Sequence, residues 1–142
     1  MRRGFSLLEL IVVIVIAGFV LSLWVPRVSR ALDYAAANGA ADDVATAIAT
    51  TRALAVARGT RVRLRLATDS LRFDTLGTPD WGPFRAWPGP GARRVVLTAT
   101  NSVVDFTPIG FAWGVSNTTV TLTRGSQVET VVMSRLGRVR RR

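Results

Sequence analysis

The 142-residue sequence contains no cysteine and no histidine, so it lacks the side chains on which many catalytic and metal sites depend. Disulfides, Cys/His zinc sites, Ser-His-Asp triads and Cys-His pairs are all excluded. The acidic residues are scattered singly, except for the adjacent Asp42 and Asp43, which would point about 100° apart on a helix. No phosphate-binding loop, dinucleotide fingerprint or nucleophile-base pair of a hydrolase is found. We therefore expect no enzyme, with no catalytic, cofactor-binding or metal-binding residues and no small-molecule substrate.

Lysine is missing as well, because all 19 basic residues are arginine. Only 9 residues are acidic, so the net charge is +10. Such an excess favours anionic partners, either nucleic acid or lipid headgroups. A membrane helix would leave roughly 115 residues, enough for one small domain with a hydrophobic core.

The beginning of the chain is almost entirely apolar. Between Phe5 and Val25 the one strongly polar side chain is Glu9, and as a helix this run would span about 30 Å, the thickness of a hydrocarbon core. A secretory signal instead has an apolar core of about 7 to 15 residues followed by a small-residue cleavage site. Here the run is longer, and the small residue, Gly4, precedes it after a basic flank. The sequence predicts a membrane-spanning helix at residues 5–25.

The stretch Gly4-Phe5-Ser6-Leu7-Leu8-Glu9 resembles the class III signal of type IV pilins and type II secretion pseudopilins. This resemblance implies that a prepilin peptidase cuts between Gly4 and Phe5, which makes residues 1–4 a leader peptide. It also implies that the new Phe5 amine is N-methylated and that the apolar helix stays in the mature protein.

Glu9 has two interpretations. A carboxylate near the end of a membrane helix costs a few kcal/mol unless it is paired or reaches the interface. It can extend to the headgroups and favour the N-terminal helix dipole. Alternatively, it neutralises the Phe5 amine of a neighbouring subunit inside a helical bundle. The resemblance implies that this second contact sets subunit register during filament assembly.

Residues 26–59 predict an amphipathic helix that continues the membrane helix. A narrow stripe at helical spacing is formed by Val44, Ile48, Thr51 and Ala55. Pro26 either kinks or ends the membrane helix, and Asn38-Gly39 is either a bend or a cap. We expect one long, bent helix that ends near Arg58-Gly59.

From Thr60 the hydrophobic period changes to two, which is typical of strands. Apolar and basic residues alternate: Arg61, Val62, Arg63, Leu64, Arg65 and Leu66. Residues 68–70 predict a turn and residues 71–73 a returning strand, with further strands at 94–99, 103–107, 118–124 and 128–134. A sheet face and a helix stripe must bury each other. We therefore expect an α+β fold, with a globular β domain at 60–134 packed as an antiparallel sheet on the amphipathic half of the helix.

Residues 77–92 contain four of the six prolines and four glycines, and they predict a long loop. Its aromatic residues are Trp81, Phe84 and Trp87. They either form a binding surface or pin an irregular loop onto the sheet.

Three further segments are similar to the GspH/FimT group of minor pseudopilins and minor pilins. They are residues 51–59 with the strand that follows, the F-x-P-x-G segment at 106–110, and the G-R-x-R segment at 137–140. The resemblance implies a pilin-like fold and one of two functions. The first is an H-type minor pseudopilin, a structural subunit of the periplasmic pseudopilus that drives protein export. The alternative is a FimT-like minor type IV pilin that binds DNA non-specifically for uptake.

The resemblance also implies a single-pass protein of the bacterial inner membrane, with its globular domain in the periplasm or outside. Its partners would be prepilin peptidase, inner-membrane lipid and the other pseudopilins or pilins of a filament. In either function the protein would later be part of a pilus or pseudopilus.

The last eight residues, 135–142, predict an arginine-rich tail. Its basic residues are Arg135, Arg138, Arg140, Arg141 and Arg142. Such a tail can neutralise several phosphates without reading sequence, and the arginines at 61–65 would extend the patch if they lie beside it. Alternatively, Leu136 and Val139 finish a last strand while the arginines are solvated or face anionic lipid.

Overall fold

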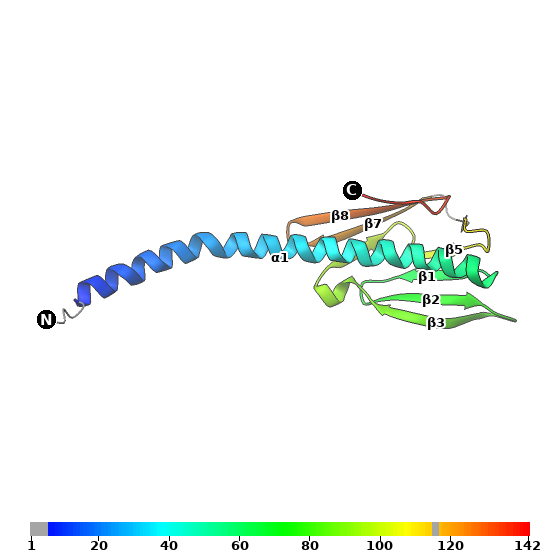
Figure 1. Cartoon of the computed structure of the whole chain (residues 1–142), viewed down its shortest axis with the longest axis horizontal. Coiled ribbons are helices and arrows are strands. Elements are labelled where there is room, and N and C mark those ends of the chain that lie inside the picture. The colour runs from blue at the N-terminus through cyan, green and yellow to red at the C-terminus, as the bar shows by residue number, and fades with distance from the viewer. Residues whose placement is uncertain (1–5, 115–116) are drawn as a thin grey trace. The chain divides into compact units, whose positions relative to one another are not determined.

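The computed structural model describes residues 6–114 and 117–142, apart from the side chains of Leu23 and Val25. The chain divides into two compact units, Met1–Leu32 and Asp33–Arg142. One helix, α1 (Leu7–Arg58), runs from the first unit into the second (Figure 1). The long helix predicted from the sequence is therefore confirmed, and it continues through both Pro26 and Asn38-Gly39.

In the first unit α1 is apolar on every side from Leu10 to Leu21. An 18-residue window of α1 has a mean hydropathy of 2.7, and its side chains are not buried by the rest of the protein. A helix that is hydrophobic all round is typical of a membrane span. This segment is long and apolar enough to cross a membrane, as the sequence predicts for residues 5–25.

In the second unit α1 buries the predicted stripe. Val44, Ile48, Thr51 and Ala55 are all at most 1% exposed. The Thr51 hydroxyl donates a hydrogen bond of 2.7 Å to the Ala47 carbonyl, which satisfies this polar group inside the core. The helix ends at Arg58, and Gly59 follows it with φ of 62°, the left-handed conformation that commonly ends helices.

The strands form two antiparallel sheets. Sheet A has the order β3-β2-β1-β5-β6, with β1 (Val62–Leu66), β2 (Ser70–Leu76), β3 (Trp81–Pro88), β5 (Val103–Phe106) and β6 (Ala112–Trp113). Sheet B has the order β4-β7-β8-β9, with β4 (Val96–Ala99), β7 (Asn117–Arg124), β8 (Gln127–Ser134) and β9 (Val139–Arg141). In Figure 1 strands of both sheets lie along the part of α1 that belongs to the second unit. The predicted α+β class is confirmed.

One hydrophobic cluster joins α1 to the inner faces of both sheets. Large, fully buried side chains come from the helix, five strands of the two sheets and the residue just before β4: Ile48, Leu64, Leu71, Phe73, Val95, Phe106, Leu122 and Met133. Alternate residues of β1 point inward, as the period of two predicts. Because the chain has no disulfide, this cluster is the main source of stability for the globular unit.

The prediction of a loop at residues 77–92 is wrong. Half of this segment is strand β3, which pairs with β2 from Ser70↔Pro88 to Leu76↔Trp81, and a short 3-10 helix, η1 (Pro90–Arg93), follows. β3 lies at the edge of sheet A, where prolines are tolerated because one side of the strand needs no ladder hydrogen bonds. The pairing register also shifts at Phe73/Asp74, opposite the part of β3 that contains Pro83.

The aromatic residues of β3 have separate contacts. Trp87 packs edge-on against Phe73, with ring centroids 4.8 Å apart, which supports the interpretation that aromatics hold this segment on the sheet. The ring of Phe84 lies 3.7 Å from the guanidinium carbon of Arg58 at the end of α1.

Candidate functional sites at the helix start and the C-terminal strand

Ser6 defines the start of α1. The Glu9 N–H donates to Ser6 Oγ at 3.2 Å, and the Leu10 N–H donates to the Ser6 carbonyl at 3.2 Å. Ser-x-x-Glu is the capping-box pattern, so the start of this helix has a local signal in the sequence. Glu9 therefore lies in the first turn, where a carboxylate also favours the helix dipole.

Gly4 and Phe5, the predicted processing residues, lie outside the described residues. The expected contact between Glu9 and a Phe5 amine therefore stays a prediction. Within the protomer the Glu9 side chain is exposed.

The arginine-rich C-terminal segment is not a free tail. β9 pairs with β8 at Met133↔Val139 and Val131↔Arg141, and just beyond it Thr130 and Arg142 exchange backbone hydrogen bonds of 2.8 and 2.9 Å. The alternative that Val139 finishes a last strand is therefore correct, although Leu136 lies in the preceding turn and is exposed.

Gly137 sets the path of the chain just before β9. Its φ is 72°, and a Cβ at this position would lie 3.0 Å from Phe106 Cε1 and 3.2 Å from the Gly110 carbonyl oxygen. The glycine thus makes a tight turn against the core and does not loosen the backbone. The turn leads directly into β9, whose Val139 packs against the hydrophobic cluster.

The strand divides the predicted arginines between two faces. Arg141 turns to α1, where it hydrogen-bonds Asp42 and Asn38. By the alternation of side chains along a strand, Arg138, Arg140 and Arg142 lie together on the opposite, outer face of sheet B. Within residues 6–114 and 117–142, no carboxylate is paired with these three arginines or with Arg135.

The outer face of sheet B also carries hydroxyl groups. Thr98, Thr121 and Thr130 are cross-strand neighbours on this face. Glu129 pairs with the buried Leu122 and so belongs to the other face. Arginines and hydroxyls without a carboxylate are the side chains that contact phosphate groups. We call this surface the basic face; it consists of Thr98, Thr119, Thr121, Thr130, Ser134, Arg138, Arg140 and Arg142.

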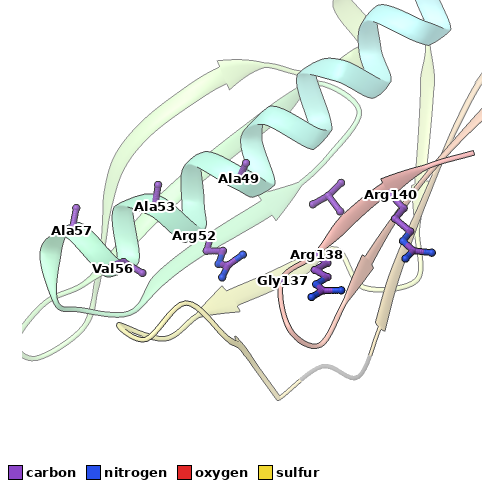
Figure 2. Close-up of a pocket in the computed structure, with 9 residues that line it drawn as sticks. Ala49, Arg52, Ala53, Val56, Ala57, Gly137, Arg138 and Arg140 are labelled. Carbon is purple, nitrogen blue, oxygen red and sulfur yellow. The ribbon is translucent and has the colours of Figure 1, made fainter.

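A groove of about 670 Å³ lies between α1 and the start of β9. Figure 2 shows Arg52 extending from α1 toward β9, while Arg138 and Arg140 leave the strand in a common direction. The lining residues are Ala49, Arg52, Ala53, Val56 and Ala57 of α1, and Gly137, Arg138, Val139 and Arg140. The helix side is therefore mostly apolar, with arginines on both walls.

The arginines at positions 61, 63 and 65 do not extend the basic face. On the outer face of sheet A, Asp105 accepts two hydrogen bonds from Arg63, at 2.7 and 2.8 Å, and one from Arg61 at 3.1 Å. Arg65 is paired with Asp74 at 2.8 Å. The hydrogen bond to Asp105 raises the pKa of Arg63, so its charge is firmly held. These ion pairs neutralise much of the charge that the sequence suggested for nucleic acid.

Two tryptophans complete this cluster. The guanidinium carbon of Arg63 lies 4.0 Å from the Trp81 ring centroid, and that of Arg61 lies 4.7 Å from Trp113. Cation–π contacts of this kind add to the ion pairs. The cluster is not evident from the sequence, because its members come from five strands whose register is not visible there.

Two family profiles match the chain. Residues 40–137, more than half of the sequence, match the family described as type II transport protein GspH. The chain belongs to the GspH family. Residues 1–25 of this GspH-family chain also match the prokaryotic N-terminal methylation motif. The predicted family is thus confirmed, and it is a pseudopilin family of structural, non-enzymatic proteins.

Solved structures confirm the pilin-like fold of the GspH-family chain. The type IV minor pilin FimU of Pseudomonas aeruginosa aligns with a TM-score of 0.62 at 15% identity, over 74% of this chain and 91% of FimU. The minor pseudopilin EpsH of the Vibrio cholerae type 2 secretion system aligns with a TM-score of 0.59 at 13% identity, over 74% of this chain and 94% of EpsH. No curated protein sequence matches the chain.

Proposed function

We propose that this GspH-family chain is a minor pseudopilin, a structural subunit of the periplasmic pseudopilus that drives protein export by type II secretion. The observation that carries the proposal is the methylation motif at residues 1–25 on an apolar helix that continues without a break into the packed globular unit. A helix that supplies both the membrane anchor and part of the domain core suits a subunit that passes from membrane to filament.

Maturation would begin with cleavage by prepilin peptidase between Gly4 and Phe5. The protein would be anchored by a single helix in the bacterial inner membrane, with the globular unit in the periplasm. Its partners would be membrane lipid before assembly and other pseudopilins afterwards. The apolar surface of the first unit would then exchange lipid for the neighbouring helices of the filament.

Glu9 would guide this exchange. Taking a carboxylate into a helical bundle is costly unless an opposite charge meets it. The Phe5 amine that cleavage creates on a neighbouring subunit would supply that charge. Because Ser6 fixes the first turn of α1, the carboxylate has a defined position along the helix, which is what a register contact requires.

The test replaces Glu9 by Ala in cells that assemble the filament. Processing should remain normal, while incorporation into sheared filaments should fall at least about tenfold, since the loss of a charge pair of about 1.4 kcal/mol or more has that effect. Glu129→Ala removes the other glutamate of the chain. This variant is the matched control and should assemble normally. Normal incorporation of Glu9→Ala would refute the register role. Replacement of Gly4 should prevent cleavage, as read by N-terminal sequencing.

A second candidate function is that of a FimT-like minor type IV pilin that binds DNA non-specifically. The basic face favours it, because same-face residues along β9 lie about 6.7 Å apart and therefore present a row of guanidinium groups to successive phosphates. Such contacts would bind DNA without sequence preference.

Fluorescence anisotropy with duplex DNA, on the full chain in detergent micelles at two salt concentrations, tests this candidate. The double variant Arg138→Ala, Arg140→Ala should weaken binding at least about tenfold and reduce its salt dependence. The double variant Arg61→Ala, Arg65→Ala, on the other sheet, is the control and should bind normally. Absence of binding at low salt would eliminate this function.

A further inference from the structure

β9 has an open edge. It ends the strand order of sheet B, so only β8 pairs with it. The Ser134 N–H donates to the Arg138 carbonyl, and the backbones of Thr130 and Arg142 exchange two hydrogen bonds. The even-numbered residues of the C-terminal segment therefore turn their backbone groups toward β8. Because alternate residues of an antiparallel edge strand turn outward, the N–H and C=O groups of Val139 and Arg141 face the unpaired side.

The edges of β3 and β4 are protected. β3 contains Pro83 and Pro88, which have no N–H to offer. At β4 the Thr68 hydroxyl accepts from the Leu97 N–H at 3.2 Å and donates to the Leu97 carbonyl at 3.4 Å. β6, the other edge of sheet A, is only two residues long. Within the described residues, β9 offers an edge without proline or such a side-chain contact, and it lies directly beside the groove of α1.

The groove has the two properties that an added strand would need. Its helix side presents the small apolar side chains of Ala49, Ala53 and Ala57, spaced by one turn, over which a flat chain can lie. Its volume of about 670 Å³ is typical of clefts that hold a ligand.

Charge indicates the chemistry of the occupant. Arg52, Arg138 and Arg140 line the groove, and no carboxylate in the described part of the chain is paired with them. The backbone of a nucleic acid has no N–H group for the Val139 carbonyl and would leave the alanines in contact with water. An acidic polypeptide satisfies the arginines, the strand edge and the apolar wall together.

We propose that an extended, acidic segment of a partner polypeptide adds to sheet B at β9. It would exchange backbone hydrogen bonds with Val139 and Arg141, as in other cases of β-strand addition. Its alternate side chains would lie on Ala53 and its neighbours, and its carboxylates would pair with Arg52, Arg138 and Arg140. This site depends neither on cleavage at Gly4 nor on the register role of Glu9.

The first experiment measures peptide binding to the full chain in detergent micelles by fluorescence anisotropy. The probe is a capped, labelled hexapeptide of alternating valine and glutamate. Two controls separate its features: lysine in place of glutamate removes the charge match, and methylation of every backbone nitrogen removes strand pairing. The Val-Glu peptide should bind at least about tenfold more tightly than either control. Equal binding of the N-methylated peptide or of the lysine peptide would overturn the proposal.

Amide exchange locates the bound peptide. With the Val-Glu peptide the exposed-edge amides of Val139 and Arg141 should exchange at least about tenfold more slowly, because each gains a hydrogen bond. The Arg140 amide, which already faces β8, should change little. Unchanged exchange at Val139 in the presence of saturating peptide would refute strand addition.

Two variants test the groove independently. Val139→Pro removes one outward N–H but none that faces β8, and Ala53→Glu places a negative charge on the exposed helix wall without disturbing the core. Each variant should weaken binding of the Val-Glu peptide at least about tenfold. Thr46→Glu, at an exposed position of α1 outside the groove, should leave binding unchanged. If duplex DNA displaces the peptide and binds Ala53→Glu as weakly as the peptide does, the groove is a nucleic-acid site and the proposal is wrong.

Discussion

Asp105 should be the most sensitive polar residue of the globular unit. Its carboxylate is 9% exposed and accepts hydrogen bonds from both Arg61 and Arg63, whose side chains are 29% and 23% exposed. Asp105→Ala leaves two guanidinium groups without a partner. Removal of one member of a buried ion pair costs about 3 to 5 kcal/mol, and the partial exposure of the arginines favours the lower end, about 3 kcal/mol.

Replacement of an arginine partner of Asp105 should cost much less stability. After Arg63→Ala the carboxylate of Asp105 still accepts from Arg61 at 3.1 Å, so we expect a loss of about 1.5 kcal/mol, the value of a charged hydrogen bond. Arg61→Ala should cost still less, because Arg61 contributes a single, longer contact and its buried Nε has no hydrogen-bond partner in the described part of the protein. The three variants therefore have a predicted order, not only a predicted direction.

Urea unfolding of the full chain in detergent measures this order. Tryptophan fluorescence is a suitable signal, because Trp81 and Trp113 lie over the two guanidinium groups. With a slope of about 1.5 kcal/mol per molar urea, Asp105→Ala should lower the midpoint by about 2 M and Arg63→Ala by about 1 M. A loss below about 1 kcal/mol for Asp105→Ala, or equal losses for the two variants, would refute the shared-carboxylate account.

Two further comparisons use the same unfolding assay. Gly137→Ala should lower the free energy of unfolding by about 3 kcal/mol, because its φ is 72° and a Cβ would lie 3.0 Å from Phe106. Gly114→Ala, with φ of 74° and open space around it, should lower it by only about 1 kcal/mol. Equal losses would contradict the packing role of Gly137. Arg124→Ala should cost about 1 to 2 kcal/mol of stability, because the Arg124 side chain, which pairs with Asp33, is only 23% exposed. Arg93→Ala, at a half-exposed pair with Asp43, should change stability by no more than about 0.5 kcal/mol. The reverse order would contradict this burial argument.

Periodicity predicted the helix and most strands because these signals are local. The stripe through Val44 and Ile48 and the alternation at Val62 and Leu64 each lie within one element, and both are buried as expected. The same local reasoning failed at residues 77–92. Proline and glycine content indicates a loop only if the segment needs ladder hydrogen bonds on both sides, and an edge strand such as β3 does not.

The polar contacts were beyond the sequence for a different reason. Arg63 and Asp105 are 42 residues apart, and their pairing depends on β1 lying beside β5. Nothing in the sequence states that order, because β2 to β4 intervene. The same holds for the C-terminal segment: its arginine content is evident, but its division between two faces follows only from the register of β9 with β8.

The ion pairs also explain why the remaining surface charge of this protein favours anionic partners. α1 contributes Asp33, Asp42 and Asp43 to pairs with arginines of β7, β9 and η1. When Asp74 and Asp105 are included, most of the carboxylates of the globular unit are paired with arginines within the fold. The basic face and the groove beside β9 keep their charge because, among the described residues, no carboxylate is paired with Arg52, Arg138, Arg140 or Arg142.

Salt concentration separates the two partners that this charge admits. DNA on the basic face releases condensed counterions, so its affinity should fall about 10-fold or more between 50 and 200 mM salt if it meets at least two phosphates. A peptide strand at β9 draws much of its affinity from backbone hydrogen bonds and apolar contact, which salt barely screens. We therefore expect the affinity of the Val-Glu peptide to fall less than about fivefold over the same range of salt concentration. A salt dependence as steep as that of DNA would show that charge alone holds the peptide, and that β9 does not pair with it.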